Sequence, residues 1–63
     1  MIKEYDVIYA KHDLSEKIKC GTKGVVLLIL NASPYKYEVE FVDKNNDFLE
    51  LMTVDESDID LSL

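Results

Sequence analysis

Residues 35–43 read Tyr-Lys-Tyr-Glu-Val-Glu-Phe-Val-Asp, and this stretch decides the fold because large apolar residues alternate with charged ones. Successive side chains of a β-strand point to opposite faces of its sheet. The apolar set should therefore form one face of a strand and pack into the core, and it consists of Tyr35, Tyr37, Val39 and Phe41. Glu38 and Glu40 should point to solvent on the opposite face.

Turn-forming residues divide the rest of the chain into short runs, which is typical of all-β proteins. We expect strands at residues 5–11, 23–30, 35–42, 48–54 and 59–63. The three in the middle should form a meander. The sequence thus predicts an all-β fold, a small five-stranded SH3-like barrel with a short helical turn before the last strand, as a single domain over residues 1–63.

The regions around the first strand should add to the core. Tyr5, Val7 and Tyr9 alternate and are expected to share one face. Leu14 and Ile18 are four residues apart in a segment too short for an independent helix, and both can turn toward the core.

The turns are expected where residues tolerate unusual backbone angles. Gly21 and Gly24 permit positive φ where the chain re-enters the sheet. Asn45 and Asn46 tolerate the left-handed conformation of a tight hairpin, and residues 31–34 should form another turn.

Two features of the remaining chain affect its surface. Residues 25–30 are apolar at every position, so this strand needs cover on both faces, from a curled sheet or from a partner. Residues 55–58 suit a single helical turn capped by Asp55, after which Ile59 and Leu61 should anchor the tail.

The charge of the chain is unevenly distributed. Its formal net charge is -6, and residues 32–63 carry two lysines against nine acids, whereas residues 1–31 carry five lysines against four acids. All seven basic residues are lysines, so the chain has no arginine, the residue that most often binds phosphate and guanine through paired hydrogen bonds. A negative field repels nucleic acid and attracts cationic partners, although acidity can also serve solubility alone.

Chemical motifs are sparse. Residues 43–47 resemble the first half of a calcium loop, but Phe48 stands where that loop needs glycine and Val54 where it needs glutamate, so a hairpin turn explains them better. His12 and Cys20 are the only residues of their kinds and do not make a zinc site. We expect Cys20 to be structural and the protein to have no cofactor, no metal and no catalytic activity.

Two binding modes have weak support in the sequence. The double-glycine turn is also found in small RNA-binding barrels, but those use basic loops and exposed aromatics, whereas the second half of this chain is acidic. The tyrosines could line a groove for a proline-rich peptide. Core packing with hydroxyls at the rim is the preferred interpretation of Tyr5, Tyr9, Tyr35 and Tyr37.

The order of several motifs resembles a family of short bacterial proteins catalogued only as a domain of unknown function. The matching motifs are Tyr5-Asp6-Val7, Asp13-Leu14, Gly21-x-x-Gly24-Val25-Val26, Tyr37 to Phe41 with Asp43, and Thr53-Val54 ahead of Ile59. The resemblance implies an SH3-like barrel and a small stand-alone protein that is sometimes associated with toxin and immunity gene neighbourhoods. It implies no catalytic residue.

These observations lead to a functional hypothesis. We expect a protein-binding module, an immunity protein or antitoxin that neutralises a basic, nuclease-like toxin through an acidic surface. The acids expected to contact the partner are Glu38, Glu40, Glu50, Asp55, Glu56 and Asp58.

An alternative from another class is a small structural subunit of a homo-oligomer or larger complex, motivated by the apolar run at residues 25–30. The longest apolar run is too short to span a membrane, and charged residues interrupt any signal-peptide pattern near the start. The sequence therefore predicts a cytoplasmic protein that binds neither membrane nor nucleic acid.

Overall fold

Strand β3 (Lys36–Val42) pairs antiparallel with a strand on each side. The computed structural model describes residues 2–30 and 35–61. Its other elements are β1 (Val7–Ala10), β2 (Lys23–Leu30), β4 (Phe48–Asp55), the 3-10 turn η1 (Glu56–Asp58) and β5 (Ile59–Asp60).

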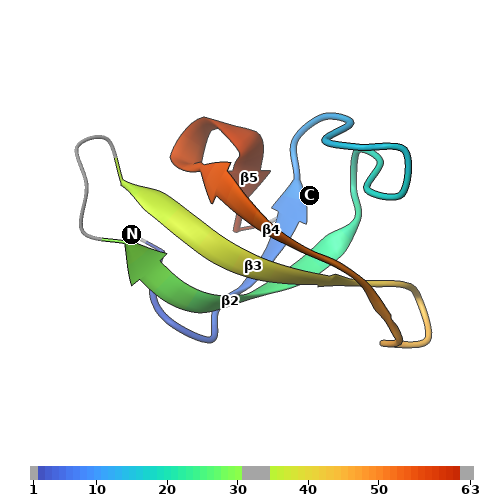
Figure 1. Ribbon diagram of the computed structural model, residues 1–63, viewed down its shortest axis with the longest axis horizontal. Helices are drawn as coiled ribbons and strands as arrows, with labels where there is room; N and C mark the ends of the chain where they lie inside the picture. Colours follow the sequence, from blue (N-terminus) through green and yellow to red (C-terminus); the bar gives the residue numbers. More distant parts are fainter. Residues whose placement is uncertain (1, 31–34, 62–63) are drawn as a thin grey trace.

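The five strands form one antiparallel sheet in the order β4-β3-β2-β1-β5. Figure 1 shows the sheet curling into a half-barrel, with η1 leading from the end of β4 to β5. Because the last strand returns to pair with the first, this is the strand order of an SH3-like barrel, and the predicted fold is confirmed. The first and last strands are shorter than expected: β1 has four residues and β5 has two.

The alternation in β3 has the predicted orientation. Tyr37, Val39 and Phe41 are buried on the concave face, and Val26 of β2 lies opposite Val39 in the register. Tyr35 precedes the strand and is half exposed, so the prediction that it packs into the core is wrong.

The predicted inward face of the first strand is wrong. Tyr5 is 72% exposed and Val7 is also exposed, whereas Ile8 and Ala10 are buried. β1 has apolar residues on both of its faces, so alternation alone does not show which face is buried. Its register with β2 determines this. Ile8 lies opposite Gly24 on the concave face, which turns Val7 outward.

The segment between β1 and β2 is anchored by one side chain. Ile18 is fully buried and Leu14 packs at the edge of the core, as predicted. The backbone N–H of Leu14 donates to the carbonyl of Ile18 at 2.8 Å, which closes a compact turn. The Ser15 hydroxyl in this turn contacts Glu50, so the turn lies beside β4.

The two glycines have different roles. Gly21 has φ of 90°, which confirms the expected positive φ. Gly24 lies within β2, and a Cβ atom there would be 2.6 Å from Cγ1 of Val39. Gly24 is therefore required by close packing against β3, a contact that no local sequence pattern reveals.

The β3–β4 connection is a tight turn, as expected. Asn46 has φ of 65°, and the Asp43 carboxylate accepts hydrogen bonds from the backbone N–H groups of Asn45 (2.8 Å) and Asp47 (3.0 Å). These bonds explain the calcium-like spacing as turn chemistry. The other predicted turn, at residues 31–34, lies outside the described residues.

Two expectations for the C-terminal segment have different outcomes. Asp55 occupies the N-cap position of η1, and Ile59 is buried as predicted. Leu61 is exposed and does not anchor the tail. Within residues 2–30 and 35–61, no helix has the length and apolar character needed to cross a membrane.

Candidate protein-binding surface

Glu38 and Glu40 lie on the convex face of β3, away from the core. Both side chains are partly buried by their neighbours across the sheet. Glu38 lies opposite Thr53 of β4 and accepts a hydrogen bond from the Thr53 hydroxyl. Glu40 lies between Val25 of β2 and Leu51 of β4. The structure therefore places this predicted pair of acids within a sheet surface rather than at a loop.

Apolar side chains surround these two acids. Val7 lies opposite Val25, so Val7, Val25, Glu40 and Leu51 form one row across four strands. Leu28 lies opposite Glu38 in the next row. Val7, Leu28 and Leu51 are 43%, 46% and 50% exposed.

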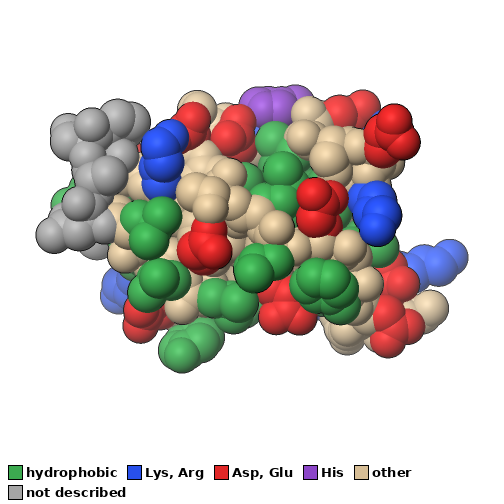
Figure 2. Space-filling model, in the orientation of Figure 1, with side chains coloured by type: hydrophobic (Ala, Val, Ile, Leu, Met, Phe, Trp, Pro, Cys, Tyr) green, Lys and Arg blue, Asp and Glu red, His purple; other side chains and the backbone are tan. Residues whose placement is uncertain are grey.

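We define the outer-face patch as Val7, Val25, Leu28, Glu38, Glu40 and Leu51. Figure 2 shows hydrophobic and acidic side chains interspersed on the side of the molecule that it presents. The apolar members of the patch were not among the predicted site residues. The unbroken apolar run at residues 25–30 was a signal for the β2 members, but residues 48–54 lack an alternation that would have identified Leu51.

Glu50 belongs to a different surface. It lies opposite Phe41, whose side chain is buried, and directly opposed residues of two strands share a face. Its carboxylate accepts a hydrogen bond from the Ser15 hydroxyl at 2.9 Å. Glu50 therefore faces the segment between β1 and β2 and is separated by the sheet from Glu38 and Glu40.

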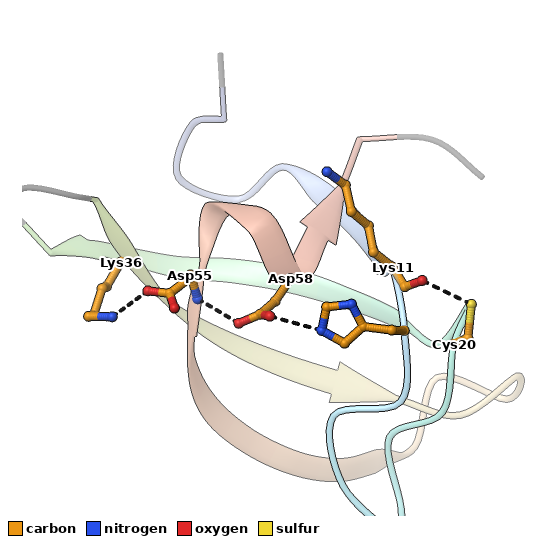
Figure 3. Close-up of polar contacts among 6 residues, drawn as sticks. Lys11, Cys20, Lys36, Asp55 and Asp58 are labelled. Atoms are coloured by element: carbon orange, nitrogen blue, oxygen red, sulfur yellow. Dashed lines mark hydrogen bonds and ion pairs between the residues drawn. The ribbon is translucent and has the colours of Figure 1, made fainter.

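Asp55 and Asp58 are engaged in a chain of polar contacts at one end of the half-barrel. The ammonium of Lys36 pairs with Asp55, and the backbone N–H of Asp55 donates to Oδ2 of Asp58 at 3.0 Å. Oδ1 of Asp58 lies 2.9 Å from Nε2 of His12. Figure 3 shows Lys36 of β3, Asp55 at the end of β4 and Asp58 of η1 in this chain of contacts.

This chain of contacts gives Asp55 and Asp58 a structural role. Exposed polar contacts of this kind each contribute about 1 kcal/mol or less, but here they join the turn that directs the chain into β5 to β3 and to His12. Glu56, by contrast, is exposed, and its side chain forms no hydrogen bond or ion pair with another described residue. Of the three predicted acids near η1, Glu56 is the one whose carboxylate is available to a partner.

The surroundings of the buried side chain of Tyr37 change its acidity. Its burial raises the pKa of the phenol, and the negative charge of Glu56 and the neighbouring Tyr35 raise it further. The neutral phenol is therefore the favoured form in the folded protein. This environment is the expected result of packing a tyrosine in the core with its polar end toward the rim.

His12 belongs to this chain of contacts through Asp58, whereas Cys20 has a separate contact. The Cys20 thiol is exposed and donates to the carbonyl of Lys11 at 3.2 Å. Across the described residues, no group of three or more His, Cys, Asp or Glu side chains is arranged to hold a metal ion.

The comparisons with known proteins identify a family and give no relative of assigned function. No curated protein and no solved structure matches the chain. One family model matches residues 4–61, which is nearly the whole sequence. The chain therefore belongs to the family DUF4926, described as a domain of unknown function.

Proposed function

We propose that this protein is a binding module that recognises a basic protein partner through its outer-face patch. The observation that supports the proposal is the placement of Glu38 and Glu40 among the exposed side chains of Leu28 and Leu51. Apolar burial supplies affinity, and the two carboxylates select a cationic surface and orient it.

A toxin that acts on nucleic acid is the partner class that fits this surface best. Such an enzyme presents lysines and arginines to phosphate groups, and carboxylates on a rigid sheet can occupy the same positions. The net charge of -6 also accelerates encounter with a basic protein. We therefore propose an immunity or antitoxin role, in which binding alone blocks the substrate face of the toxin.

A cognate pair from one gene neighbourhood provides the test. The protein and an adjacent toxin domain are co-expressed, and protection from growth arrest is measured together with the Kd by calorimetry. Glu40→Lys should weaken binding by about tenfold or more, since it places a cation against a cationic surface. Asp47→Lys makes the same change of charge on the exposed β3–β4 turn and is the matched control.

The two variants separate specific recognition from general electrostatic attraction. Glu40→Lys should lose protection, whereas Asp47→Lys should retain it. If the two variants weaken binding equally, the outer-face patch is not the contact surface and only the net charge matters.

A second candidate function is that of a subunit in a homo-oligomer. The exposed side chains of Leu28 and Leu51 support it, because a second copy of the protein could bury them. Two copies meeting through the outer-face patch would bring Glu38 and Glu40 of one near those of the other, which opposes self-association. Light scattering across micromolar concentrations distinguishes the cases. A stable dimer that Leu28→Lys dissociates would favour this second function.

A further inference from the structure

Strand β4 ends the sheet on one side. It pairs with β3 along one edge, and no described strand pairs with its other edge. Half of the backbone N–H and C=O groups of such a strand point outward, where an added strand can bond them. An eight-residue edge strand is therefore a template for a further strand unless something covers it.

A groove runs beside the first half of this edge. One wall is the Ser15–Lys17 part of the β1–β2 segment, and the other is Phe48 to Leu51 of β4. The groove has a volume of about 490 Å³ and is open to solvent. Four strand residues span about 13 Å, so this wall can pair with a short extended segment.

Two side chains of β4 determine which segment fits. Phe48 is 61% exposed on the groove wall, so its ring is available for contact. Glu50 is partly buried in the same groove, where its carboxylate has one hydrogen bond, from the neutral Ser15 hydroxyl. Among the described residues no cation pairs with Glu50.

This combination of a ring and an incompletely paired carboxylate suits a long cationic side chain. The stem of an arginine or lysine can lie along the aromatic ring while its charged end reaches the carboxylate. A second copy of β4 would instead bring another Glu50 to this edge, and a charge on an edge strand that opposes self-pairing is a common protection.

We propose that an extended, arginine- or lysine-containing segment of the basic partner adds as a strand to the free edge of β4, with one cationic side chain in the groove beside Phe48 and Glu50. This inference rests on the proposed function, because it assumes the same basic partner. Leu51 belongs both to β4 and to the outer-face patch, so one partner can contact the edge and the convex face together.

The experiment uses the full chain and a synthetic eight-residue peptide in which arginine and valine alternate. Amide chemical shifts and amide hydrogen exchange are recorded by NMR during titration. Binding should shift the amides of residues 15–17 and 48–51 and slow exchange along the outer edge of β4. A peptide with glutamate in place of arginine should not bind.

Two changes separate strand addition from simple charge attraction. N-methylation of the outward-bonding peptide amides should abolish binding, because it removes the donors and blocks close approach. Glu50→Gln keeps an acceptor for the Ser15 hydroxyl and should weaken peptide binding by about fivefold. Asp47→Asn removes the same charge outside the groove and should have no such effect.

Three results would overturn the proposal. These are equal binding of the N-methylated peptide, shifts confined to β2 and β3, and no binding at millimolar peptide. The cognate toxin separates this failure from failure of the proposed function. If Glu40→Lys weakens toxin binding and Glu50→Gln does not, the outer-face patch remains the contact surface and strand addition is wrong. If neither variant has an effect, both proposals fail.

Discussion

Gly24 of β2 lies directly opposite Phe41 of β3, and a Cβ atom on Gly24 would be 2.9 Å from Cδ1 of the Phe41 ring. The same Cβ would be 2.6 Å from Cγ1 of Val39. The ring of Phe41 is fully buried and cannot move outward without opening the core. The absence of a side chain at position 24 is therefore a condition for β2 and β3 to pack as they do.

Gly24→Ala should lower the free energy of unfolding by about 1–3 kcal/mol, the usual range for an overpacked core. Urea denaturation measures this change. The double variant with Val39→Ala provides a control, because removing the Val39 methyl groups relieves the closer of the two contacts of the new Cβ. The two substitutions should be less destabilising together than the sum of their separate effects. Additive effects would show that the contact between position 24 and Val39 is not strained.

Ile18 should be the main anchor of the β1–β2 segment. It is fully buried although the segment has no regular secondary structure. Ile18→Ala should cost about 2–4 kcal/mol, which is a large part of the stability of so small a protein. Ile18→Val should cost about 1 kcal/mol. A thermal unfolding experiment that found the alanine variant as stable as the valine variant would contradict this role.

Asp58 should stabilise the junction of β4, η1 and β5. Its carboxylate contacts both the backbone N–H of Asp55 and the ring of His12. Asp58→Ala should lower the free energy of unfolding by about 1 kcal/mol, and His12→Ala by less, because it removes only the partly screened side-chain contact. Chemical denaturation at low and high salt distinguishes the two contributions. Glu56→Ala, in the same turn, should be close to neutral.

The raised pKa of Tyr37 should make stability fall at alkaline pH. The folded protein holds the phenol proton more tightly than the unfolded chain does. The stabilising contribution is therefore complete below the ordinary tyrosine pKa of about 10 and is lost as the pH rises through the higher folded value. Tyr37→Phe should reduce this alkaline loss in denaturation curves between pH 8 and 11. Tyr5→Phe, at an exposed position, is the matched control, and an equal effect of both variants would contradict the prediction.

The fold was predictable from β3 because its alternation leaves one choice of inward face. Tyr37, Val39 and Phe41 are all apolar and their neighbours are charged, so only one orientation buries no charge. The sequence of the first strand does not restrict the inward face in this way, because Val7 and Ile8 are both apolar and lie on opposite faces. Its orientation depends on Ile8 meeting Gly24, a contact between residues that are distant in sequence.

The candidate surface was less predictable for a similar reason. Glu38 and Glu40 follow from the period of a single strand. The face on which Glu50 lies depends on the pairing of β4 with β3, in which Glu50 is opposite Phe41. No local pattern in residues 48–54 reveals this pairing.

The sequence by itself determined the all-β class, the succession of strands along the chain and the face of β3 that enters the core, because these depend on local periodicity and turn chemistry. Tertiary structure decided which acids share a surface and which apolar residues remain exposed beside them. These properties arise from register, the curvature of the sheet and contacts such as Ser15 with Glu50, all of which join distant parts of the chain.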